Sequence, residues 1–190
     1  MNGDAIALLL SPVAAGVLAG YAARGSLAGF LRFKLRALWL LWLAVLVQIC
    51  ELYGQALGPG WRLPTLGVTY ALSGTWLGIN LPGRPLAMKA AVGTALAGGL
   101  ANGVAIAVNG RMPYLPAAAR AAGVAPSAAT PKNVPAAPGT HLIVLGDIVP
   151  VGLLHTVISV GDVLIILATV ALIAATMRMQ PRLPLAQPED

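Results

Sequence analysis

The chain has 190 residues, of which 58% are hydrophobic and only 9% are charged. A typical soluble domain carries about 25% charged residues, so the composition excludes an ordinary water-soluble fold and indicates an integral membrane protein. The 12 Lys and Arg against 6 Asp and Glu give a net charge of +6. These bases lie in loops beside apolar runs with few aromatic residues among them, which argues against a nucleic-acid partner and favours a role in membrane topology.

Apolar runs separated by loops predict an all-α fold, a single polytopic membrane domain with about five transmembrane helices. Each crossing takes about 20 apolar residues. We do not expect the first run to be a secretory signal, because Asp4 precedes it without any Lys or Arg and the cations come after it. The predicted spans cover residues 5–23, 37–57, 66–81, 87–108 and 157–177.

Two segments between the last spans are predicted to differ from the rest. Residues 113–140 are rich in Ala and Pro and predict an external loop, with one helical turn near residues 117–122, because repeated prolines exclude a long helix. Residues 141–155 are apolar but interrupted by Asp147 and Pro150, and they are too short to cross. We expect a re-entrant or interfacial segment there; a sixth span is the alternative.

The distribution of cations predicts the orientation. With the N-terminus outside, eight Lys and Arg near helix ends fall on the inner side and four on the outer side. This bias is typical of a membrane protein with an external N-terminus and an internal C-terminus. Residues 178–190 then form a cytoplasmic tail.

Polar residues in the predicted spans gather in the outer half. A charged side chain at mid-bilayer costs about 2.5–3.5 kcal/mol, so each one requires an explanation. They predict a polar pocket that opens to the extracytoplasmic side, in which Arg111 engages an anionic group, the two asparagines donate hydrogen bonds and the carboxylates set the charge or exchange a proton. The expected ligand-binding residues are Glu51, Asn102, Asn109, Arg111, Asp147 and Asp162.

Structural explanations compete with this hypothesis. Ser159 and Asp162 stand three apart before an apolar run, the spacing of a helix capping box. Asp147 can pair with Arg111, and Glu51 has no cation within one helical turn, which leaves a partner elsewhere, a bound proton or contact with water. The glycine pairs at spacing four are explained by close helix packing.

No catalytic or metal signature is present. His141 and His155 with the nearby carboxylates offer metal ligands, but their spacing matches no recognised site. Neither a nucleophile elbow nor a phosphate-binding glycine loop occurs. We therefore predict no metal and no cofactor, and assign no catalytic residue.

Three short motifs give the chain a resemblance to a known family. They are Asn-Gly-Arg-Met-Pro at 109–113, Gly-Asp-Ile-Val-Pro at 146–150 and Ser-Val-Gly-Asp at 159–162. With them the chain resembles a family of small bacterial multi-pass membrane proteins known only as a domain of unknown function. The resemblance implies an integral protein of the bacterial cytoplasmic membrane, and it supplies no activity or substrate.

Three functions therefore stay open. The first is binding of a small molecule or a lipid headgroup in the outer pocket, as a sensor or a transport-linked component. The second is a structural or accessory subunit of a larger membrane complex, with another membrane protein or a second copy as its partner. The third is an enzyme acting on an outer-leaflet lipid or isoprenoid, with Asp147, Asp162 and the histidines as acid and base. Membrane lipids surround the protein in all three.

Overall fold

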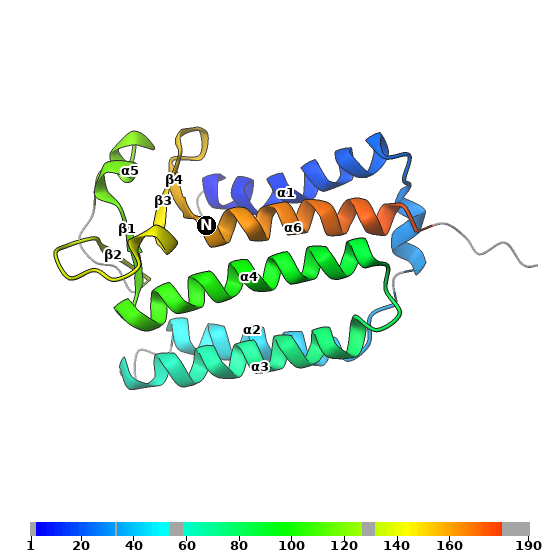
Figure 1. Ribbon diagram of the computed structural model, residues 1–190, viewed down its shortest axis with the longest axis horizontal. Helices are drawn as coiled ribbons and strands as arrows, with labels where there is room; N and C mark the ends of the chain where they lie inside the picture. The colour runs from blue at the N-terminus through cyan, green and yellow to red at the C-terminus, as the bar shows by residue number, and fades with distance from the viewer. Residues whose placement is uncertain (1–2, 33, 54–58, 127–131, 180–190) are drawn as a thin grey trace, which may run out of the picture.

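The described residues form five long helices. These helices lie side by side along the molecule, and a small cap of strands and a short helix covers one end of the bundle (Figure 1). The computed structural model describes residues 3–32, 34–53, 59–126 and 132–179. Each long helix falls on one of the five predicted apolar runs. The helices are α1 (Gly3–Ala22), α2 (Trp39–Tyr53), α3 (Arg62–Asn80), α4 (Leu86–Asn109) and α6 (Val160–Met177).

Two of these helices, α4 and α6, are long and apolar enough to cross a membrane. Only 22% of each apolar window is buried inside the bundle, whereas the core helix of a soluble protein is mostly buried. Among the described residues, the apolar parts of α1 and α2 are shorter, at Leu10–Ala22 and Trp39–Cys50. Two helices of spanning length are thus supported, fewer than the five predicted.

The tightest packing joins α6 to α4 and to α1, and glycines make it possible. A Cβ on Gly98 of α4 would overlap the carbonyl oxygen of Gly161, and a Cβ on Gly16 of α1 would lie within 3 Å of Ile173. Bare backbone at these positions lets the helices approach closely. The core follows this seam, with Ala105, Ala168 and Met177 almost fully buried.

The α2–α3 hairpin packs mainly on itself and touches the rest of the bundle at fewer points. Gln48 Nε2 of α2 donates to Thr69 Oγ1 of α3 at 2.9 Å. The Tyr70 hydroxyl of α3 donates to the carbonyl oxygen of Gly99 on α4. The Tyr70 ring also lies against Gly103, where a larger residue would obstruct it.

The prediction of an all-α fold is wrong in the cap, which contains a four-stranded sheet in the order β2-β1-β3-β4. Strand β1 runs parallel to β2 and β3, and β3 and β4 form an antiparallel hairpin. The strands are three to five residues long and three of them contain proline, so an alternation of apolar and polar residues does not reveal them in the sequence. They are β1 (Met112–Tyr114), β2 (Asn133–Pro135), β3 (Asp147–Val151) and β4 (Thr156–Ser159).

The segment predicted as re-entrant or as a sixth span supplies one strand of this sheet and leads directly into another. It contains the 3-10 turns Ile143–Leu145 and Gly152–Leu154 with β3 between them, and β4 follows directly after it. No helix of spanning length lies in residues 141–155. Within the predicted external loop, α5 (Pro116–Ala121) stands where one helical turn is expected, with proline at its start.

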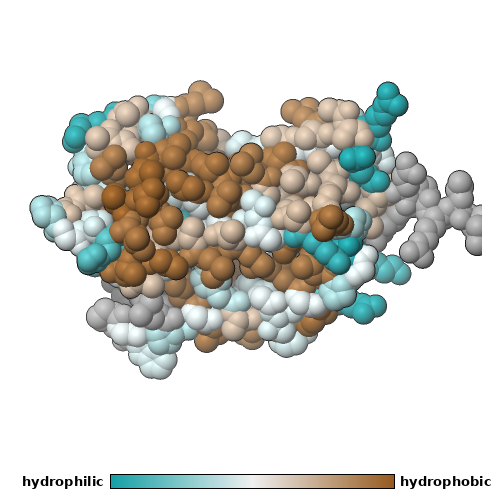
Figure 2. Space-filling view, in the orientation of Figure 1, coloured by the Kyte–Doolittle hydropathy of each residue, from teal (hydrophilic) through white to brown (hydrophobic). Residues whose placement is uncertain are grey.

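Large apolar side chains cover the outside of the helices. Figure 2 shows a broad hydrophobic surface along the bundle, with hydrophilic residues concentrated toward its ends. Soluble monomers rarely expose contiguous apolar patches of more than a few hundred Å². The exposed residues include Leu18, Trp39, Trp42, Val68, Leu86, Leu100 and Leu167.

Candidate functional site

The polar residues nearest to one another lie where the cap meets α4 and α6. Ser159 caps α6: its Oγ accepts from the Asp162 backbone N–H at 2.9 Å, and Asp162 Oδ2 accepts from the Ser159 N–H at 3.0 Å. This is the predicted capping box, so the structural explanation of Asp162 is confirmed. The carboxylate also lies at the positive end of the helix dipole, which stabilises its charge.

Asn102 of α4 ties this cap to the neighbouring helix. Its Nδ2 donates to Asp162 Oδ1 at 2.8 Å, and its Oδ1 accepts from the Ser159 hydroxyl at 2.7 Å. The contact depends on Gly161, because a Cβ there would overlap Asn102 Oδ1. Ser159 is 0% exposed. The three side chains therefore satisfy one another within a buried junction.

Asp147 adds a second carboxyl group to the same region. It is the first residue of β3, and the antiparallel register places it opposite Ser159 of β4. Asn133 of β2 donates its Nδ2 to Asp147 Oδ2 at 2.7 Å. Asp147 is only 8% exposed, which is unusual for a carboxyl group. The sheet thus carries Asp147 to the capped end of α6.

The surroundings of Asp147 favour its protonated form. Burial, and then the charge of Asp162, raise the pKa of the Asp147 carboxyl to about 7, against a smaller lowering by the Asn133 hydrogen bond. No cation of the described chain is among the groups that set this pKa, and the predicted pairing with Arg111 is absent from the described contacts. The two carboxyl groups can therefore take up positive charge. We call Asp147 and Asp162 the carboxylate pair.

The other predicted site residues have different positions. Asn109, at the end of α4, holds the loop before β3: its Nδ2 donates to the His141 carbonyl at 2.8 Å and its Oδ1 accepts from the His141 N–H at 2.9 Å. Arg111 follows Gly110, whose φ of 72° ends α4. Glu51 lies in α2, and its side chain is outside the described part of the structure.

The structure therefore gathers Asn102, Asp147 and Asp162 and gives Asn109 a structural role. No contact between Arg111 and these carboxyl groups is among those of the described residues. Asn133 is a member that the sequence does not predict. It lies in the Ala/Pro-rich stretch, where neither periodicity nor a motif marks it. Only the parallel pairing of β1 and β2, which sets Asn133 opposite Met112, brings it to the carboxylate.

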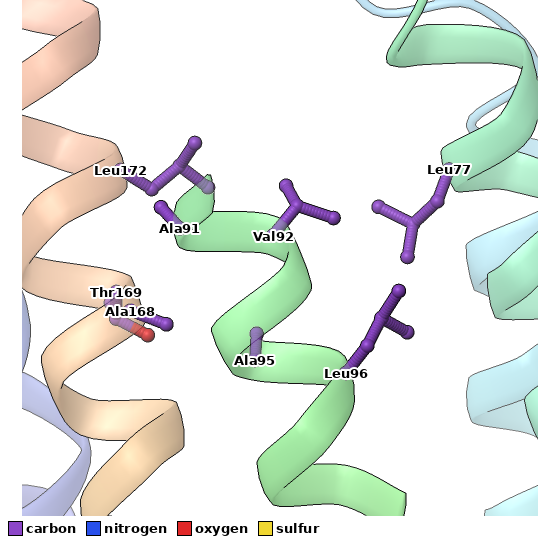
Figure 3. Close-up of a pocket in the computed structure, with 8 residues that line it drawn as sticks. All are labelled: Leu77, Ala91, Val92, Ala95, Leu96, Ala168, Thr169 and Leu172. Atoms are coloured by element: carbon purple, nitrogen blue, oxygen red, sulfur yellow. The ribbon is translucent and has the colours of Figure 1, made fainter. Parts of the chain in front are cut away.

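Metal-ligand side chains are not grouped in the described part of the chain, where no three His, Cys, Asp or Glu come together. An apolar hollow of about 200 Å³ between α3, α4 and α6 also lies away from the carboxylate pair. Figure 3 shows Leu77 of α3 facing Val92 and Leu96 of α4 across it, with α6 side chains on the other flank.

Comparison with known proteins identifies a family and no activity. The model of a family of unknown function (DUF5317) matches residues 32–174, which include the carboxylate pair, the helices α2, α3 and α4, and most of α6. No curated protein and no solved structure matches the chain. Because the match covers well over half of its length, the chain belongs to the DUF5317 family, a family of unknown function.

Proposed function

We propose that all five long helices cross the bacterial cytoplasmic membrane, with the cap on the extracytoplasmic side. Their side-by-side arrangement supports this proposal (Figure 1). The loops and helix ends opposite the cap hold most of the described cations, as expected for the cytoplasmic side. These cations are Arg24, Lys34, Arg36, Arg84, Lys89 and Arg178.

The function that the geometry supports best is binding of a small positively charged species at the carboxylate pair, and the proton is the simplest such species. The observation that carries this proposal is a buried carboxyl group beside a second one, with no cation of the described chain among the groups that set its pKa. The closed junction favours a proton or a small cation over the lipid headgroup or larger molecule that the sequence also suggests. The protein would then act as a sensor of conditions outside the membrane.

The hydrogen bonds around the pair provide a route from binding to the helices. Asp162 holds both the start of α6 and Asn102 of α4. Asp147 holds the edge strand β2 through Asn133. A change in charge at Asp162 alters bonds that join the start of α6 to β4 and to α4, and a change at Asp147 alters the bond between β3 and β2 within the cap. Such a local electrostatic change can bias the position of the whole cap.

Two experiments test the proposal separately. For the topology, Ala137→Cys in the cap and Ser26→Cys at the opposite end are compared in a Cys50→Ser background; both positions are exposed. A membrane-impermeant maleimide should label the cap variant in intact cells and the other only after permeabilisation. The reverse pattern would contradict the orientation.

For binding, thermal denaturation is followed in detergent at pH 8 with Na⁺, K⁺, ammonium and methylammonium, and then across pH without them. A proton site predicts stabilisation on acidification and no effect of the cations. A cation site predicts stabilisation by one of them that is lost in Asp147→Asn. Gly74→Ala serves as the control, because Gly74 lies in α3 away from the cap and a Cβ there would meet no atom of the described chain within 4 Å. If the wild-type protein is stabilised neither by acidification nor by any of these cations, the proposed function is refuted.

An accessory subunit is the second candidate, and the exposed face of α3 favours it. A Cβ added at Gly67, Gly74 or Gly78 would meet no atom of the described chain within 4 Å, in contrast to the packed Gly98 and Gly161. Small residues on a lipid-facing helix permit close approach of another helix. Gly74→Ile should then abolish copurification of a partner while leaving the protein folded. An unchanged set of copurifying proteins would refute this candidate.

A further inference from the structure

A second polar region lies at the end of the bundle opposite the cap. A pocket of about 330 Å³ opens there between the linker before α2, the α3–α4 turn and the end of α6. Three basic residues from two different segments line it, namely Lys34, Arg36 and Arg84. Lys34 and Arg36 are exposed and Arg84 is partly exposed, so solvent or lipid can reach the pocket.

Hydrogen bonds to the backbone build this pocket. Asn80, the last residue of α3, accepts from the Arg36 N–H at 2.8 Å and donates to the Arg36 carbonyl at 3.0 Å. Arg84 donates from Nε to the Asn80 carbonyl at 3.1 Å and from an Nη to the Lys34 carbonyl at 2.8 Å. The linker is thereby fixed against the α3–α4 turn, and the basic residues are brought to one place.

The acids whose positions are described lie far from this pocket. No acidic residue is among its lining residues. Asp4 lies at the start of α1, Glu51 near the end of α2, and the carboxylate pair in the cap, all at the other end of the bundle. Opposite charges more than a Debye length away, about 8 Å at physiological salt, neutralise little of the field of Lys34 and Arg36.

Beside Asn80 and Gly83, the other lining residues are apolar, namely Ile79, Pro82, Pro85 and Met179. A ligand with one anionic group and an adjoining apolar part matches such a lining. Arg and Lys bind phosphate strongly through charge-assisted hydrogen bonds. In the proposed topology this pocket lies at the cytoplasmic interface, where anionic lipid headgroups occur.

We infer that the pocket lined by Lys34, Arg36 and Arg84 binds a phosphate group, as carried by an anionic phospholipid headgroup. The inference rests on the proposed membrane crossing for the source of the phosphate. It does not depend on the function of the carboxylate pair.

The test measures lipid binding to the full-length protein by native mass spectrometry. Protein in neutral detergent is titrated with phosphatidylglycerol, and in a parallel arm with glycerol phosphate and inorganic phosphate. Lys34→Gln/Arg36→Gln removes two charges but keeps the Asn80 and Arg84 contacts, which use only the backbone of these residues. Lys89→Gln, a cation of α4 outside the pocket lining, is the matched control.

Each basic side chain near an anionic surface contributes about fivefold to binding, so the double variant should weaken phosphatidylglycerol binding on the order of 25-fold. Lys89→Gln should stay within about twofold of the wild type, because its charge lies outside the pocket. The wild-type protein could instead bind glycerol phosphate, and the double variant could lose that binding to the same extent. This result would identify a free phosphate as the source and refute the lipid source.

Equal losses in the double variant and in Lys89→Gln would overturn the inference, because only the general positive charge of this end would then matter. Wild-type affinity in the double variant would also overturn it. The acidic residues Glu189 and Asp190 of the chain's own C-terminus are the competing occupant. Glu189→Gln/Asp190→Asn should leave lipid affinity unchanged; a large gain in affinity would show that the tail occupies the pocket instead.

Discussion

Replacing Asp147 with Asn removes a carboxyl group that is half protonated in the folded protein near neutral pH. The pKa of Asp147 is about 7 in the fold, against 3.8 as its ordinary value. Above pH 7 the folded protein must carry a buried charge, whereas well below pH 3.8 the group is neutral in both states. The wild-type free energy of unfolding therefore falls as the pH rises from about 4 through the folded pKa of about 7.

The size of this effect follows from the two pKa values. One pKa unit corresponds to about 1.4 kcal/mol, so the contribution lost between pH 4 and pH 8 is about 4 kcal/mol. For a chain of this length that is on the order of 10 °C in the thermal midpoint. The comparison of the wild type with Asp147→Asn isolates this contribution, because the two proteins share all their other titrating groups.

The assay is thermal denaturation of both proteins in the same detergent at intervals from pH 4 to pH 8. The midpoints should be similar at pH 4, and Asp147→Asn should become the more stable protein as the pH rises. Asn mimics the neutral acid in size and can still accept the hydrogen bond from Asn133. A constant difference across this range would contradict this expectation, because the stability of the fold would then not depend on the Asp147 proton.

Five further substitutions concern the neighbours of this group, the helix packing and the loop before β3. Asp162→Asn should lower the pKa of Asp147, because it removes a nearby negative charge. Asn133→Ala should raise that pKa, because it removes a hydrogen bond to the ionised form. Titration of the thermal midpoint against pH measures both pKa shifts, and shifts of equal sign would contradict the assignment. Gly98→Ala should destabilise the bundle by about 1–3 kcal/mol through overlap with α6. Gly74→Ala, in open space, should instead be neutral or stabilise by up to about 1 kcal/mol in the same unfolding measurement, and equal losses would argue against the α4–α6 seam. Asn109→Ala should cost about 1–3 kcal/mol and make the loop before β3 more sensitive to limited proteolysis; unchanged cleavage would contradict the anchoring role.

Local signals in the sequence predict the helices and one part of the site. The long apolar runs locate all five helices because burial in a membrane or a bundle demands many consecutive apolar residues. The capping box at Ser159 and Asp162 is also local, since its two residues are three apart. Asn102 and Asn109 both lie on α4, at a spacing of seven that aligns them on one face.

The sheet depends on contacts between distant residues, and sequence reasoning misses it for this reason. Strands of three to five residues carry too little alternation to detect, and Pro113, Pro135 and Pro150 argue against strands in general. Asp147 meets the start of α6 only because the β3–β4 hairpin sets it opposite Ser159. Arg111 lies only two residues from the end of α4 and is an expected partner by sequence, but no described contact joins it to the carboxylate pair.

The most direct test of the carboxylate pair is infrared titration of the protonated carboxyl band, with wild type and Asp147→Asn compared in detergent between pH 4 and pH 9. We expect a band in the wild-type protein that disappears with a midpoint near pH 7 and is missing from the variant. A wild-type protein with no protonated carboxyl band above pH 5 would contradict proton binding at Asp147, because the Asp147 carboxyl group would then be ionised near neutral pH.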